Sequence, residues 1–145
     1  MTSQLMFFFM FMGGVAVAIQ PSINGRLAQR VGFVESSFIS FAVGTLVLLA
    51  VLLLGGRGSL RALGDVRWWE LTGGFLGAFF VTLTIVIVPR IGTASAMAAT
   101  ITAQLMTGLL LDHYGFFGFR TVPLDGKRFV GAVLLFIGAS LVFRR

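Results

Sequence analysis

A stripe of small and polar residues in the second half of the chain is the strongest candidate for solute binding. Its members recur at every fourth position: Thr100, Gln104, Gly108 and Asp112. Residues spaced by four share one face of a helix, and polar side chains within a membrane usually face other helices or a water-filled cavity. The stripe therefore predicts one of two roles. Its polar groups bind a solute, with Gln104 as the central residue, or they form hydrogen bonds between helices, each worth about 1 kcal/mol or less.

A second polar group surrounds a proline near the start of the chain, in the sequence Gln20-Pro21-Ser22-Ile23-Asn24. Gln20 and Asn24 are one helical turn apart, and Pro21 removes one backbone hydrogen bond. The freed carbonyl group and the two amides could bind a solute together. The same residues also fit a simple kink whose amides cap the end of a helix, and the sequence leaves both interpretations open.

The ionisable residues offer little for catalysis. Glu35, Asp112 and His113 lie at the ends of apolar segments, and the chain has one histidine and no cysteine. No arrangement of nucleophile and base is present, so we expect no enzymatic activity and no bound metal or cofactor. Asp112 alone could carry a proton in a proton-coupled transporter, because it ends the polar stripe. The alternative is an ordinary solvated charge at a helix end.

The composition places these residues in a membrane protein. Of the 145 residues 57% are hydrophobic and 11% are charged, and the mean hydropathy is +0.99, far from the composition of a soluble domain. The net charge of +6 would raise the question of nucleic acid in a soluble chain. Here the basic residues separate apolar runs, as anchors at lipid headgroups do, and this placement excludes nucleic acid as a partner.

Five apolar runs predict an all-α integral membrane protein with five transmembrane helices in one membrane domain, residues 1–145. The approximate spans are residues 4–23, 34–54, 68–88, 92–111 and 125–143. Turn-like composition predicts that the first connection opens at Asn24-Gly25-Arg26 and that the third is Pro89-Arg90-Ile91-Gly92.

Small residues within the spans predict close helix packing or a dimer contact. Gly73 and Gly77 form a GxxxG pair in the third span, and Gly131 and Gly138 stand seven residues apart in the fifth. Ser36, Ser40 and Gly44 of the second span suggest the same kind of packing.

The basic residues do not favour either direction of insertion. If the spans alternate, one face of the membrane receives six of them and the other five: Arg57, Arg61, Arg67, Arg120, Lys127 and Arg128 against Arg26, Arg30, Arg90, Arg144 and Arg145. Excess Lys and Arg marks the cytoplasmic side, so a near-tie suggests either dual topology or an accidental balance. Two oppositely inserted copies would form a ten-helix inverted repeat, a common transporter layout.

Four segments carry a family resemblance. The chain reads Q-P-S-I-N-G-R-L at residues 20–27, W-W-E-L-T-G-G-F-L-G-A at 68–78, V-P-R-I-G at 88–92 and A-Q-L-M-T-G-L-L-L-D-H-Y-G at 103–115. In these motifs and their order it resembles the YdcZ-like proteins of the drug/metabolite transporter superfamily. The resemblance implies a multi-pass protein of the bacterial inner membrane and half of a ten-helix inverted-repeat architecture. Small multidrug resistance relatives use a glutamate in their first span, whereas Gln20 is neutral, so multidrug export by that mechanism is not implied.

The leading hypothesis is a secondary transporter that binds a small metabolite or drug-like solute between Gln20, Asn24 and the stripe around Thr100 and Gln104. It would alternate access as a homodimer, or as a heterodimer with a paralogue, in contact with membrane lipids. A non-transporting membrane subunit that assembles with a partner membrane protein is the alternative, and a passive channel is a third possibility.

Overall fold

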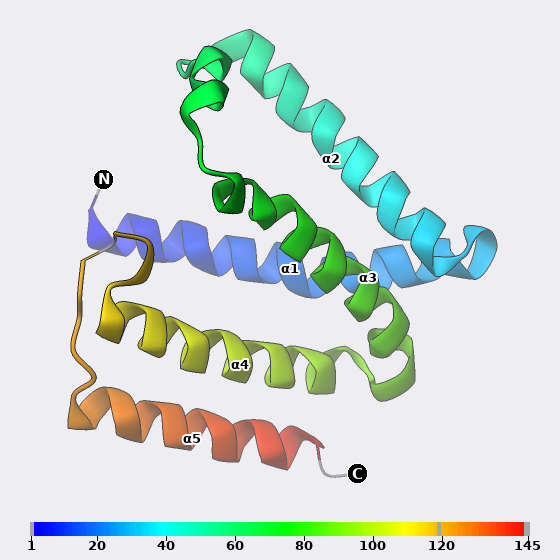
Figure 1. The fold of residues 1–145 in the computed structure, drawn as a ribbon. Coiled ribbons are helices and arrows are strands. Elements are labelled where there is room, and N and C mark those ends of the chain that lie inside the picture. The colour runs from blue at the N-terminus through cyan, green and yellow to red at the C-terminus, as the bar shows by residue number, and fades with distance from the viewer. Residues whose placement is uncertain (1, 119, 144–145) are drawn as a thin grey trace. The chain divides into compact units, whose positions relative to one another are not determined.

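The computed structural model describes residues 2–118 and 120–143, and most of them lie in five long helices (Figure 1). These are α1 (Ser3–Val31), α2 (Phe33–Gly55), α3 (Gly73–Ile91), α4 (Thr93–Tyr114) and α5 (Gly126–Phe143). Short 3-10 helices cover Leu60–Asp65, Trp68–Thr72 and Phe116–Gly118. Each long helix is long and apolar enough to cross a membrane, the third from Trp68 onward. The prediction of an all-α chain with five apolar helices is confirmed.

The chain divides into two compact units, Met1–Arg90 and Ile91–Arg145. In the first unit α1 packs against α2 beside the turn that joins them, and the two helices diverge from that turn (Figure 1). Residues 3–17 of α1 and 43–55 of α2 are all exposed. These segments are almost wholly apolar, which suits the hydrocarbon interior of a membrane.

The first turn lies at Gly32 and not at Asn24-Gly25-Arg26, so that sequence-based expectation is wrong. These three residues are helical, and α1 and α2 are separated by Gly32 alone, whose φ is 100°. Asn24 and Gly25 are buried against neighbouring helices, and these tertiary contacts outweigh their preference for turns. The backbone reverses instead where a glycine can adopt positive φ.

The turn expected over Pro89-Arg90-Ile91-Gly92 is likewise shorter than predicted. Helix α3 includes Pro89 and continues to Ile91, and only Gly92, with a φ of 86°, is non-helical before α4. The ring of Pro89 packs beside Gly25 of α1, where an added Cβ would lie 3.3 Å from Pro89 Cγ. The missing side chain of Gly25 therefore allows α1 and α3 to approach closely.

The second unit is an antiparallel pair of helices, with α4 and α5 side by side (Figure 1). The segment that joins them returns along the end of α4. Val122 N–H donates to the carbonyl oxygen of Asp112 over 2.9 Å, and Leu124 N–H donates to Nδ1 of His113 over 3.2 Å. Asp125 then begins α5 by accepting a 2.8 Å hydrogen bond from Arg128 N–H. These bonds fix the start of α5 beside the end of α4.

We predict that Gly32→Ala destabilises the protein by about 1–2 kcal/mol, because a Cβ at positive φ is strained and would also meet the Glu35 carboxylate. Gly44→Ala is the matched control. Gly44 lies within α2 with open space around it, so alanine there should be neutral or stabilising. Thermal unfolding of the two purified variants in detergent, followed by tryptophan fluorescence, measures both effects. Equal melting temperatures would rule out a strained turn at Gly32.

Candidate functional site

A hydrogen-bonded polar cluster holds the first unit together. The side-chain amide of Asn24 donates to Ser40 Oγ over 3.1 Å, and Ser36 Oγ donates to the backbone carbonyl of Asn24 over 2.8 Å. One bond then joins α3 to α2, from Thr82 Oγ1 to Ser37 Oγ over 2.9 Å. The cluster therefore links all three helices of this unit.

Burial shows what the cluster does. Asn24 is 6% exposed and Ser36 is fully buried, and among the described residues no buried side-chain polar atom lacks a hydrogen-bond partner. Side chains this deeply buried are hardly accessible to a solute. The geometry therefore supports a role for Asn24 in helix packing.

Gln20 differs from Asn24 although the two are one turn apart. Its side chain is exposed and makes no hydrogen bond within the described part of the chain. Pro21, which follows it, is fully buried. Position 20 therefore keeps a free amide, whereas position 24 does not.

The glycines predicted to serve packing have unequal surroundings. A Cβ on Gly77 of α3 would lie 3.4 Å from Phe41 Cζ of α2, so the two helices are in contact there. Gly73, Gly131 and Gly138 have nothing within 4 Å of such a Cβ. A contact through these three glycines with a second molecule stays a prediction.

In the second unit, three members of the α4 stripe line a groove between α4 and α5 with a volume of ≈ 490 Å³, which we call the polar groove. Gln104, Gly108 and Asp112 lie along one wall, and Gly131 of α5 lies on the other. Thr100 is half-buried one turn before Gln104 and is not among the lining residues. The Gln104 side chain is exposed and has no hydrogen-bond partner in the described ranges, so its amide is free to bind a solute.

An ion pair closes one end of the polar groove. Arg128 Nη1 lies 3.3 Å from Asp112 Oδ2, and both residues line the groove. From the sequence we predicted a possible role for Asp112 in proton coupling, whereas Arg128 was interpreted only as a membrane anchor. In the sequence, opposite charges on either side of a short return segment are weak evidence for an ion pair. Only the folded chain shows that Asp112 and Arg128 meet.

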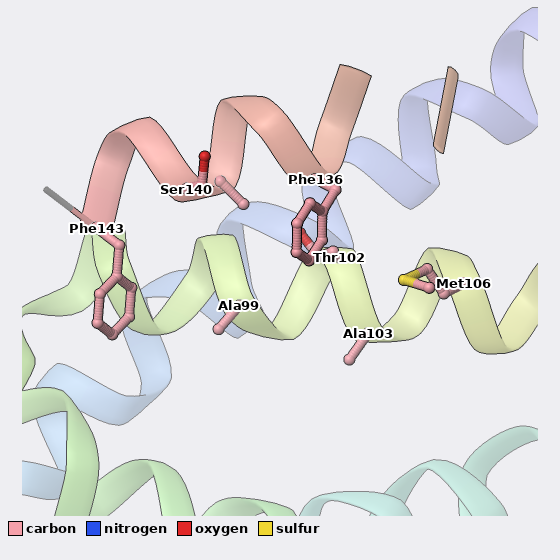
Figure 2. A pocket seen from close by; sticks show the side chains of 8 residues that line it. Ala99, Thr102, Ala103, Met106, Phe136, Ser140 and Phe143 are labelled. Atoms are coloured by element: carbon pink, nitrogen blue, oxygen red, sulfur yellow. The ribbon is translucent and has the colours of Figure 1, made fainter. Parts of the chain in front are cut away.

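The other side of the α4–α5 pair carries an apolar groove of ≈ 630 Å³ (Figure 2). Met106, which lines it, is about 200° around the helix from Gln104. Phe136 and Phe143 reach from α5 toward α4. The two hydroxyl groups that line this groove already donate to carbonyl groups of their own helices. Thr102 donates to Ala98 over 2.8 Å, and Ser140 donates to Ile137 over 2.7 Å. This groove thus offers van der Waals contact but little polar recognition.

The predicted binding residues fall in both units. Gln20 and Asn24 belong to Met1–Arg90, and Thr100, Gln104 and Asp112 belong to Ile91–Arg145. That the two groups converge on one solute stays a prediction. Within the second unit, Gln104 and Asp112 share the polar groove.

Comparisons with known proteins agree on one family. Residues 5–141 match the family described as "Putative inner membrane exporter, YdcZ". The chain is also 31% identical over 148 residues to the inner membrane protein YdcZ of Escherichia coli (strain K12), a match that covers 100% of this chain and 99% of that protein. No solved structure matches the chain.

We predict that Asn24→Ala lowers the stability of the protein by about 1–2 kcal/mol, because it removes the bond to Ser40 in a buried position. Gln20→Ala, in the same helix, should leave stability unchanged since its side chain is exposed. Thermal unfolding in a nonionic detergent separates the two. If both variants melted with the wild type, the cluster would contribute nothing to packing.

Proposed function

Because the chain belongs to the YdcZ inner membrane exporter family and is a multi-pass protein of the inner membrane, we propose that it is a half-unit of a secondary transporter for a small solute. The observation that carries this proposal is the polar groove. In a chain that is 57% hydrophobic, it combines a free amide at Gln104 with a partly exposed ion pair at Asp112 and Arg128. Polar side chains at membrane depth are costly and are usually functional, and Gln104 lies within the fourth candidate span.

Gln104 is the proposed central binding residue, and Gln20 is the proposed contribution of the first unit. Both amides are exposed and unpartnered in the described ranges, as free recognition groups must be. Asn24 acts by positioning α1 against α2, and Thr100 extends the polar face of α4 by one turn. Proton coupling through Asp112 stays a prediction, since its carboxylate pairs with Arg128.

The transporting form is proposed to be a dimer of oppositely inserted copies, with ten helices arranged as an inverted repeat. Two features of the sequence support it. Five spans place the two ends of the chain on opposite sides of the membrane, and the six-to-five distribution of basic residues gives insertion no clear direction. A dimer of this kind can alternate access by rocking one protomer against the other.

Gln104→Ala is predicted to reduce transport about five- to thirtyfold, because loss of one hydrogen bond to the solute costs about 1–2 kcal/mol. The assay is uptake by proteoliposomes of a fixed panel of radiolabelled amino acids, sugars, organic acids and quaternary ammonium dyes. Thr107→Ala is the matched control, since Thr107 is exposed on α4 outside the polar groove.

The outcomes separate the candidate functions. Saturable uptake that Gln104→Ala reduces by this factor, with insertion and melting temperature unchanged, supports the transporter. Full activity of Gln104→Ala would remove this residue from the site. A wild type that moves no solute, yet co-purifies with another membrane protein, would instead identify a non-transporting subunit.

Dual topology predicts that each end of the chain is divided between the two sides of the membrane. The chain has no cysteine, so single cysteines placed at Ser3 and after Arg145 can be labelled with an impermeant maleimide in intact and permeabilised cells. About half of each site should be protected in intact cells. Labelling of each site wholly from one side would exclude the inverted homodimer and leave an oppositely oriented paralogue as the partner.

A further inference from the structure

The ion pair that closes the polar groove is accessible to a solute. Its one contact is long, at 3.3 Å, and the side chains of Arg128 and Asp112 are 35% and 50% exposed. A bidentate pair between these groups would be shorter and would use both carboxylate oxygens. Each charge therefore keeps hydrogen-bonding capacity for another partner.

Each charge also opposes the dipole of its own helix. Asp112 lies in the last turn of α4, where the helix end is negative, and Arg128 lies in the first turn of α5, where the helix end is positive. This arrangement concentrates negative potential on one side of the groove end and positive potential on the other. A cation is attracted to the α4 side and an anion to the α5 side.

We propose that the polar groove binds a zwitterion, a solute that carries an ammonium and an anionic group close together and is mainly apolar in the rest of its structure. The ammonium lies at Asp112 and the anionic group at Arg128. This inference rests on the proposed transport function and names its substrate class.

The rest of the groove fits such a solute. The two charges that line it cancel, so a solute with net charge leaves one of them uncompensated, which is costly in a poorly hydrated site. Leu105, Leu109 and Leu135 line the groove and suit an apolar side chain. Gln104 lies about 12 Å further along α4, where its amide can bond a polar group at the other end of the solute.

The same chemistry could come from a free solute or from the headgroup of phosphatidylethanolamine, because the pair lies near helix ends. Both present an ammonium beside an anionic group. Vesicles with and without this lipid distinguish the two sources.

The test uses the whole protein in a nonionic detergent and three matched probes. Leucine is the zwitterion, isoamylamine is leucine without its carboxylate, and 4-methylpentanoate is leucine without its amine. Thermal unfolding reports binding without requiring transport. Leucine should raise the melting temperature at concentrations about tenfold lower than either singly charged probe.

Two variants should change the order in which the three probes stabilise the protein, and they should do so in opposite directions. Asp112→Asn leaves Arg128 as the net charge, so 4-methylpentanoate should replace leucine as the best probe. Arg128→Gln leaves Asp112, so isoamylamine should become the best. Lys127→Gln, an exposed neighbour in the same turn of α5 that does not line the groove, should keep the wild-type order.

A structural ion pair would behave differently, because both variants would melt at lower temperature while the order of the probes stayed the same. That result, or three equal probes, or no shift with any probe, overturns the inference. Repeating the leucine titration in vesicles identifies the source. If phosphatidylethanolamine itself stabilises the wild type and blocks leucine, the lipid headgroup is the natural zwitterion, and if it does neither, the free solute is.

Failure of this inference can be told apart from failure of the proposed function. Uptake of any solute that depends on Gln104, without a preference for the zwitterion, would leave the transporter intact and reject only the substrate class. Binding of leucine with the predicted charge reversals, in a protein that transports nothing, would reject transport and keep the site.

Discussion

Lipid hydrocarbon supplies no hydrogen bonds, and the arrangement of polar side chains in this protein follows from that constraint. In the first unit the polar groups of Asn24, Ser36 and Ser40 bond one another between α1 and α2, and Thr82 adds α3 through Ser37. Glycine completes the packing where helices come closest, at Gly25 beside Pro89 and at Gly77 beside Phe41. The exposed surface of the long helices in this unit is mostly apolar, which suits contact with lipid.

The second unit contains the polar groove on which the proposed function rests, and its polar groups are less fully bonded to one another. Gln104 has no partner within the described residues, and the Asp112–Arg128 pair is long and partly exposed. Thr102 and Ser140, by contrast, are satisfied by carbonyl groups of their own helices. Gln104, Asp112 and Arg128 line the same groove. Polar capacity that packing does not use is available to a ligand.

The features that could be predicted from the sequence depend on residues close together in the chain, and those that could not depend on contacts between residues far apart in it. Hydropathy is summed over about twenty neighbouring residues, so the five helices could be predicted well, and a repeat of four placed Gln104, Gly108 and Asp112 on one face. The turns could not be placed, because Asn24 and Gly25 are kept helical by contacts with α2 and α3 that composition does not show. The role of Arg128 was missed for the same reason, since its partner is sixteen residues away across a return segment.

The length of the polar groove along α4 suggests why one copy of the chain would need a second copy. Its charged end lies near the end of α4, and Gln104 lies about 12 Å further along the helix, whereas the hydrocarbon core is about 30 Å thick. The polar groove of one protomer, from Asp112 to Gln104, is therefore shorter than half of that thickness. A copy inserted in the same direction would duplicate the path from the same side. A copy inserted in the opposite direction would extend it from the other surface, and two such paths would together cover about 24 Å. The short polar path and the near-equal distribution of basic residues thus favour the same assembly on independent grounds.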